Sequence, residues 1–102
     1  TFVVVGGGPT GVETAGALGE LKKHVLPRDY PELDLRRMQI HLVEAGPRVL
    51  AGMSAQAGMR ALDFLKELDV QVWLNQPVQE YDGHPVRFAS GKELQAGTLI
   101  WS

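Results

Sequence analysis

The sequence contains no cysteine in 102 residues. A disulfide framework, a thiolate metal site and a redox-active dithiol are therefore excluded within this chain. The absence of disulfides is compatible with a reducing compartment, and we expect a cytoplasmic location.

Long apolar runs and an excess of positive charge are also missing. No apolar run approaches the roughly 20 residues that a membrane-spanning helix needs. Lysine and arginine total 10 against 12 aspartate and glutamate residues, which gives a formal net charge of -2. A chain with this charge has no electrostatic attraction to nucleic acid or to an anionic membrane surface. We expect this segment to bind neither.

A buried strand followed by a glycine-rich turn opens the chain. The apolar, β-branched run Thr1–Val5 is typical of a strand that is buried on both faces of a parallel sheet. After three glycines, Pro9 suits the first position of a helix, and Gly11, Ala15 and Gly19 recur at four-residue spacing. The pattern predicts a helix with a ridge of small residues that lies close to a sheet.

The first helix is predicted to end at Pro27, because proline in a helix interior removes a hydrogen bond and clashes with the preceding turn. Segment 27–37 carries two prolines and six charges, which predicts a solvent-exposed surface loop. Ser54 is the expected N-cap of a second helix. Its apolar stripe is expected to comprise Ala55, Met59, Leu62, Leu65 and Leu68.

The remaining pattern is one of short strands. Parallel strands are predicted at 39–43, 70–74 and 98–102, and an antiparallel meander at 78–81, 86–89 and 92–94, with turns at Asp82-Gly83 and Ser90-Gly91. The fold class is therefore α/β: a Rossmann-like parallel sheet with two helices and an inserted antiparallel β-meander. Because the chain begins and ends within strands, we expect residues 1–102 to be one domain excised from a larger protein.

The glycines fit a dinucleotide-binding fingerprint, since Gly6-x-Gly8-x-x-Gly11 lies between a predicted strand and a predicted helix. In this motif Gly6 permits a tight turn, Gly8 lets the backbone approach a pyrophosphate, and Gly11 allows close contact between helix and strand. The positive end of the helix dipole can hold a diphosphate without a lysine or arginine.

Glu44 stands at the carboxyl end of the second predicted strand, where the fingerprint has an acid that binds the adenosine ribose. Its carboxylate would repel a 2'-phosphate, so NADH is favoured over NADPH, although Arg48 nearby leaves some room for NADPH. Glu44 lies 33 residues after Gly11, a larger separation than the roughly 20 residues that are usual in this fingerprint. Segment 27–37 can account for the surplus, and an ordinary exposed acid in a turn stays an alternative.

Other polar residues give weaker signals. Glu13, placed in the first turn of the helix, either opposes the helix dipole or projects toward a nicotinamide. The histidines His24, His41 and His84 share no metal-ligand spacing and are interpreted as structural or exposed. No pair of nucleophile and base is identifiable.

At Gly6–Glu13 (GGGPTGVE), followed by Ala15-Gly16 and Leu18, the sequence resembles type II, non-proton-pumping NADH dehydrogenases of the pyridine nucleotide-disulfide oxidoreductase superfamily. Segments 43–50 and 99–102 resemble that family's second strand and the strand leading back to its FAD domain. The resemblance implies a parent flavoprotein that passes a hydride from NADH to FAD and electrons to a quinone. It also implies a location on the cytoplasmic face of the membrane.

By this resemblance, residues 8–11 would face the pyrophosphate, Glu44 the ribose, Glu13 the nicotinamide end, and the backbone at Pro77 and Val78 the adenosine half. The predicted cofactor-binding residues are Gly6, Gly7, Gly8, Pro9, Thr10, Gly11, Glu13, Glu44, Ala45, Arg48, Pro77 and Val78. We expect NADH to bind here and FAD to bind in the parent's other domain, with no catalytic or metal-binding residue in this segment. Alternatives are the NAD(H)-binding domain of a ferredoxin, nitrite or disulfide reductase, an FAD-binding domain, and a non-catalytic NAD(H)-sensing module.

Overall fold

A parallel sheet forms the centre of the molecule in the computed structural model, which describes residues 1–81, 85–88 and 90–102. Its strand order is β3 (Val70–Trp73), β2 (Ile40–Val43), β1 (Phe2–Val5) and β7 (Thr98–Trp101). All neighbouring pairs run parallel, and Val5 lies opposite Val43 on one side and Trp101 on the other. The predicted parallel sheet is confirmed, and the last strand rejoins it beside the first.

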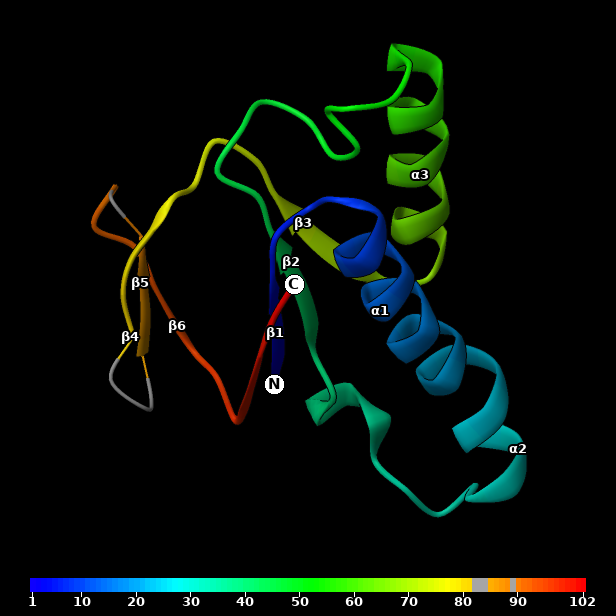
Figure 1. Cartoon of the computed structure of the whole chain (residues 1–102). Coiled ribbons are helices and arrows are strands. Elements are labelled where there is room, and N and C mark those ends of the chain that lie inside the picture. The colour runs from blue at the N-terminus through cyan, green and yellow to red at the C-terminus, as the bar shows by residue number, and fades with distance from the viewer. Residues whose placement is uncertain (82–84, 89) are drawn as a thin grey trace.

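Helices α1 (Pro9–Glu20) and α3 (Ala55–Glu67) cover one face of this sheet (Figure 1). The predicted ridge of small residues in α1 is confirmed, because Gly11, Ala15 and Gly19 are buried. A Cβ at Gly19 would come within 2.8 Å of the Leu68 Cβ, so a larger residue would push the helix away. Small side chains therefore set how closely α1 approaches its neighbours.

The prediction that the first helix ends at Pro27 is wrong. After α1 the chain continues through the π-helical turn η1 (Leu21–Val25) into α2 (Leu26–Asp29). The Leu26 N–H bonds to the Leu21 carbonyl five residues earlier, and this wider turn places Pro27 in the first turn of α2, where its missing N–H costs nothing. The helix can therefore restart at the proline.

Segment 27–37 is largely exposed, as predicted: residues 27–34, 36 and 37 are exposed and Leu35 is half-buried. It contains the short 3-10 helix η2 (Leu35–Arg37), capped by Asp34, whose carboxylate accepts the Arg36 backbone N–H at 3.2 Å. The predicted N-cap of α3 is confirmed, because the Ser54 Oγ accepts the Ala57 N–H at 3.1 Å.

The predicted apolar stripe of α3 is only partly confirmed. Leu65 and Leu68 are buried, but Ala55 is exposed and Met59 is 68% exposed. The amino-terminal half of α3 lies against the loop that follows β2 instead of against the sheet. Its apolar side chains line a surface pocket there.

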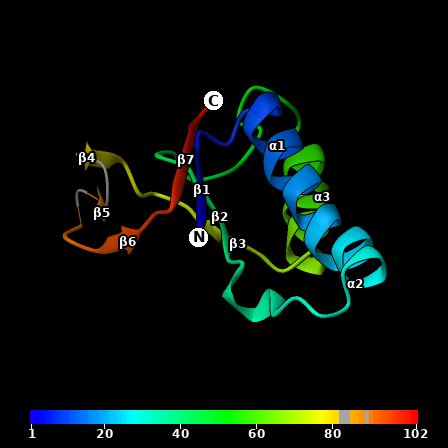
Figure 2. The same ribbon diagram turned by 90° about the horizontal axis from the view of Figure 1, so that it is seen from below.

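The predicted antiparallel meander is confirmed and packs on the opposite face of the parallel sheet (Figure 2). It consists of β4 (Val78–Tyr81), β5 (Pro85–Phe88) and β6 (Glu93–Gln95). The predicted Asp82-Gly83 turn and Ala89 lie outside the described residues, whereas Gly91 takes a positive φ of 94° in the second predicted turn. Within the described part of the chain, no helix is long and apolar enough to cross a membrane.

Candidate functional site

The glycine-rich turn joins β1 to α1 at the carboxyl edge of the parallel sheet, the upper edge in Figure 1. Gly6 has a φ of 111°, which side chains rarely permit, and its N–H bonds to the Val43 carbonyl at 2.8 Å. A Cβ at Gly11 would lie 1.7 Å from the Gly6 carbonyl oxygen. The predicted conformational roles of Gly6 and Gly11 are therefore confirmed.

Gly8 faces open space at the start of α1. It is exposed, and a Cβ built on it would meet no atom of the described residues within 4 Å. Gly8 is the N-cap of α1 and Pro9 follows at the helix start, so the backbone N–H groups of the first turn have no partner inside the helix. The open space beside these donors, at the positive end of the dipole, fits a diphosphate group.

Glu44 lies directly beside the glycine turn and is half-buried. Its Oε1 accepts the Gly7 N–H at 2.7 Å and its Oε2 accepts the Gly46 N–H at 2.6 Å. A carboxylate can accept about four hydrogen bonds, so Glu44 retains capacity for ribose hydroxyls. Glu44 follows β2 directly, at the end of the second strand as predicted, and its bonds to Gly7 and Gly46 were not foreseen from the sequence.

The loop between β2 and α3, residues 44–54, is hydrogen-bonded to the glycine turn. The Leu50 N–H donates to the Gly7 carbonyl at 2.7 Å, and Leu50 has a positive φ of 52°. The Arg48 guanidinium turns back onto the same loop, where Nη2 donates to the carbonyls of Ala51 and Met53, each at 3.0 Å. Sequence reasoning missed Leu50, because neither its residue type nor its spacing marks it.

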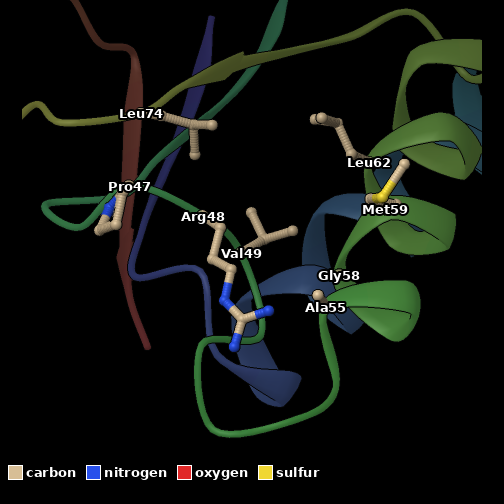
Figure 3. Close-up of a pocket in the computed structure, with 8 residues that line it drawn as sticks. All are labelled: Pro47, Arg48, Val49, Ala55, Gly58, Met59, Leu62 and Leu74. Carbon is tan, nitrogen blue, oxygen red and sulfur yellow. The ribbon is translucent and has the colours of Figure 1, made fainter.

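An apolar pocket of about 190 Å³ lies between this loop, the end of β3 and α3 (Figure 3). Leu74, Leu62 and Met59 surround it, and the Arg48 side chain extends along its rim. The full lining is Pro47, Arg48, Val49, Ala55, Gly58, Met59, Leu62 and Leu74.

The loop after β3 joins the same edge of the sheet. The Gln76 N–H bonds to the Glu44 carbonyl at 3.0 Å and the Asn75 N–H to the Gly46 carbonyl at 2.8 Å. Pro77, which is exposed, and Val78, which is half-buried, therefore follow directly on a segment bound to the Glu44 turn. The predicted residues on these loops and in the glycine turn come together at one edge.

Glu13 is exposed on α1 but begins the second turn, not the first as predicted, because the helix starts at Pro9 and its first turn contains no acid. Its electrostatic gain from the helix dipole is accordingly smaller. Whether Glu13 meets a nicotinamide stays a prediction.

His41 is buried on β2 with 3% exposure, which confirms the structural role expected for it. Its Nδ1 accepts the Trp73 Nε1–H at 3.0 Å, and its Nε2 lies 3.3 Å from the Gln39 Oε1. Because an indole N–H can only donate, Nδ1 carries no proton and the ring is neutral. Burial lowers the pKa of His41.

The structure describes one of the other two histidines. His24 is exposed and lies 3.7 Å from the Glu20 carboxylate, while His84 falls outside the described residues. Among residues 1–81, 85–88 and 90–102, no three or more His, Cys, Asp or Glu side chains gather as a metal site would require.

Comparison with known families settles the relationship that this geometry suggests. The family model described as pyridine nucleotide-disulphide oxidoreductase matches residues 1–102. The chain belongs to this family. The description of this family names oxidoreductases.

Within this family the chain is similar to type II NADH:quinone oxidoreductases. It is 37% identical to the one named Ndh from Mycobacterium tuberculosis, over 100% of this chain and 23% of the relative. It is 32% identical to that of Haemophilus influenzae, over 99% of this chain and 23% of the relative. The structure of NDH2 from Plasmodium falciparum in complex with NADH superposes with a TM-score of 0.87 at 25% identity, covering 99% of this chain and 22% of that one. The chain thus spans less than a quarter of these relatives.

Proposed function

We propose that this chain is the NADH-binding domain of a flavin-dependent NADH:quinone oxidoreductase. The observation that carries the proposal is the open space at Gly8, with the Glu44 carboxylate bonded to the adjoining Gly7 N–H at 2.7 Å. Two relatives that it matches over 99% or more of its length are named type II NADH:quinone oxidoreductases. In the parent, FAD occupies a separate domain and quinone is the electron acceptor.

The residues divide the dinucleotide among them. The backbone from Gly8 to Gly11 holds the diphosphate, and Glu44 accepts the hydroxyls of the adenosine ribose. Ala45, Pro77 and Val78 flank the adenosine half, while Glu13 lies toward the nicotinamide end. Bound NADH supplies the hydride, and the acceptor lies in the FAD domain. The isolated chain therefore binds NADH without turnover.

Discrimination against NADPH follows from charge. A 2'-phosphate would stand next to the half-buried carboxylate of Glu44, and two negative charges within a few ångströms repel each other. The parent's expected cytoplasmic location, on the membrane face, rests on the resemblance to type II enzymes.

The sharpest test of the diphosphate site is Gly8→Ala. The added methyl enters open space, so the fold should retain wild-type stability, but it occupies the room that the diphosphate needs. NADH affinity measured by titration calorimetry should fall by about tenfold or more. Gly52→Ala is the matched control, because its Cβ also meets none of the described atoms within 4 Å, and it should bind as the wild type does.

Glu44→Ala tests the specificity. NADH binding should weaken, and the preference for NADH over NADPH should disappear, because the repulsive charge is gone. Wild-type chain that produces no heat with NADH would contradict the proposal, and flavin absorbance in the purified protein would point to an FAD-binding domain.

A further inference from the structure

We propose that Arg48 is a positioning residue that, through Leu50, fixes the orientation of the Gly7–Gly8 peptide for binding a diphosphate. This inference rests on the proposed function and adds to it a residue that holds the backbone of the binding site in place. Arg48 itself need not touch the dinucleotide.

The contacts of Arg48 lie within its own loop. Nη2 donates to the Ala51 and Met53 carbonyls at 3.0 Å each, while the Met53 N–H bonds to the Leu50 carbonyl at 2.9 Å. The turn from Leu50 to Met53 is thus closed by one backbone bond and by two solvent-exposed, charge-assisted bonds from the Arg48 guanidinium. Figure 3 shows the side chain folded toward this turn.

Leu50 is the strained member of the turn. Its φ of 52° lies in the left-handed region, which a branched side chain adopts only when surrounding contacts enforce it. In this conformation the Leu50 N–H donates to the Gly7 carbonyl at 2.7 Å. Arg48 supplies the enforcing contacts on the carboxyl side of Leu50.

The two hydrogen bonds of the Gly7 backbone determine where the Gly8 N–H points. Gly7 is held at both of its polar groups, its N–H by Glu44 and its carbonyl by Leu50. Because the structure has no cis peptide bond among its described residues, the Gly7 carbonyl and the Gly8 N–H point in opposite directions. With the carbonyl fixed on Leu50, the Gly8 N–H faces away from the loop.

A diphosphate bound beside Gly8 needs this donor already in place. A preorganised N–H binds an anion without the cost of ordering the backbone first. Loss of the Arg48 bonds would free the turn, and the Gly7–Gly8 peptide would rotate between orientations. Diphosphate affinity would fall although no group that touches the ligand had changed.

The test compares Arg48→Met, which keeps the apolar stem but removes the donors, with Arg48→Lys, whose ammonium can still donate to both carbonyls. The exposed Arg60→Ala is the control for loss of a positive charge in the same part of the chain. Arg48→Met should weaken NADH binding by about tenfold, Arg48→Lys should restore most of it, and Arg60→Ala should have no effect.

Amide hydrogen exchange in the ligand-free chain supplies the second readout. In Arg48→Met the Leu50 amide should exchange about tenfold faster, while the Val12 amide inside α1 keeps its wild-type rate. Arg48→Gln gives the same comparison if the methionine variant fails to fold. A merely structural role would lower the melting temperature and speed exchange at both amides.

Two results would overturn the inference: unchanged Leu50 exchange in the Arg48→Met variant, or faster exchange with wild-type NADH affinity. These differ from failure of the proposed function, which would show as a wild-type chain that binds no NADH.

Discussion

The two faces of the parallel sheet differ in how their covering elements pack: small residues of α1 allow close approach on one face, whereas the aromatic rings of Trp73 and Phe88 fill the other. On the helix face, Gly11 and Gly19 leave so little room that a Cβ on either would overlap neighbouring atoms. On the meander face, large rings fill the space: Trp73 lies 5.7 Å from Phe88 between ring centroids, and Lys92 stands 4.9 Å over the Trp73 ring. The glycines on the helix face are therefore sensitive to added atoms, and the rings on the meander face to removed ones.

The difference has a functional side, because the small residues bring α1 close to β1 and so place its amino terminus against Glu44. The rings on the other face belong to a core that contains no residue of the glycine turn. Added volume on the helix face should impair both folding and binding, whereas truncation on the meander face should impair folding alone.

Gly11→Ala should have the largest effect. Its Cβ would lie 1.7 Å from a backbone oxygen of Gly6 that has no room to move, so the cost should exceed the about 3 kcal/mol of ordinary overpacking. Urea unfolding should show this loss, and NADH binding should become undetectable by calorimetry. Gly8→Ala is the control, and equal stability of the two variants would refute the argument.

Phe88→Ala should be next, because Phe88 is fully buried in the core beneath the meander. Loss of the ring should lower the free energy of unfolding by about 3 kcal/mol. Phe64→Ala, at an α3 residue that is 44% exposed, should cost markedly less. NADH affinity of the folded Phe88→Ala variant should match the wild type, and a large drop in affinity would show that the faces are not separable.

The smallest effect is a pH dependence of stability from His41. The unfolded chain gains a proton near pH 6.5, while the folded chain holds His41 neutral to lower pH because burial lowers its pKa. Stability should therefore fall as the pH drops below 6.5 and level off below the folded pKa, with a slope of at most about 1.4 kcal/mol per pH unit.

His41→Gln should remove that contribution. Urea unfolding between pH 7.5 and about 5.5 would measure it, above the range in which carboxylates titrate. Identical slopes for wild type and variant would rule out His41 as the source.

The parts of the site that could be predicted depend on residues close together in the sequence, whereas the parts that could not depend on contacts between distant residues. Gly6, Gly8 and Gly11 could be predicted because each role follows from a short motif between a strand and a helix. Leu50 could not, because its left-handed conformation depends on a hydrogen bond to Gly7, far away in the sequence. Arg48 was predicted as a cofactor-binding residue, and its observed bonds to its own loop depend on a turn geometry that spacing does not encode.

The fold shows the same division. The strands and the meander follow from apolar runs and turn residues, and they were predicted within one or two residues. The helix through Pro27 was not, because a shift from four-residue to five-residue hydrogen bonding leaves no periodic signature in so short a segment. Contacts within an element could be predicted, whereas exceptions to its regular geometry could not.

The position of β7 beside β1 has a consequence for how the protein is made. The Ser102 hydroxyl donates to the Gly6 carbonyl across 96 residues of chain, so the glycine turn is completed only after Ser102 has been synthesised. Central strand β1 completes its pairing only when both β2 and β7, which follow it in the sequence, have been synthesised. Nonlocal pairing of this kind slows folding, and one edge of the apolar strand β1 stays unpaired in the nascent chain until β7 has been made.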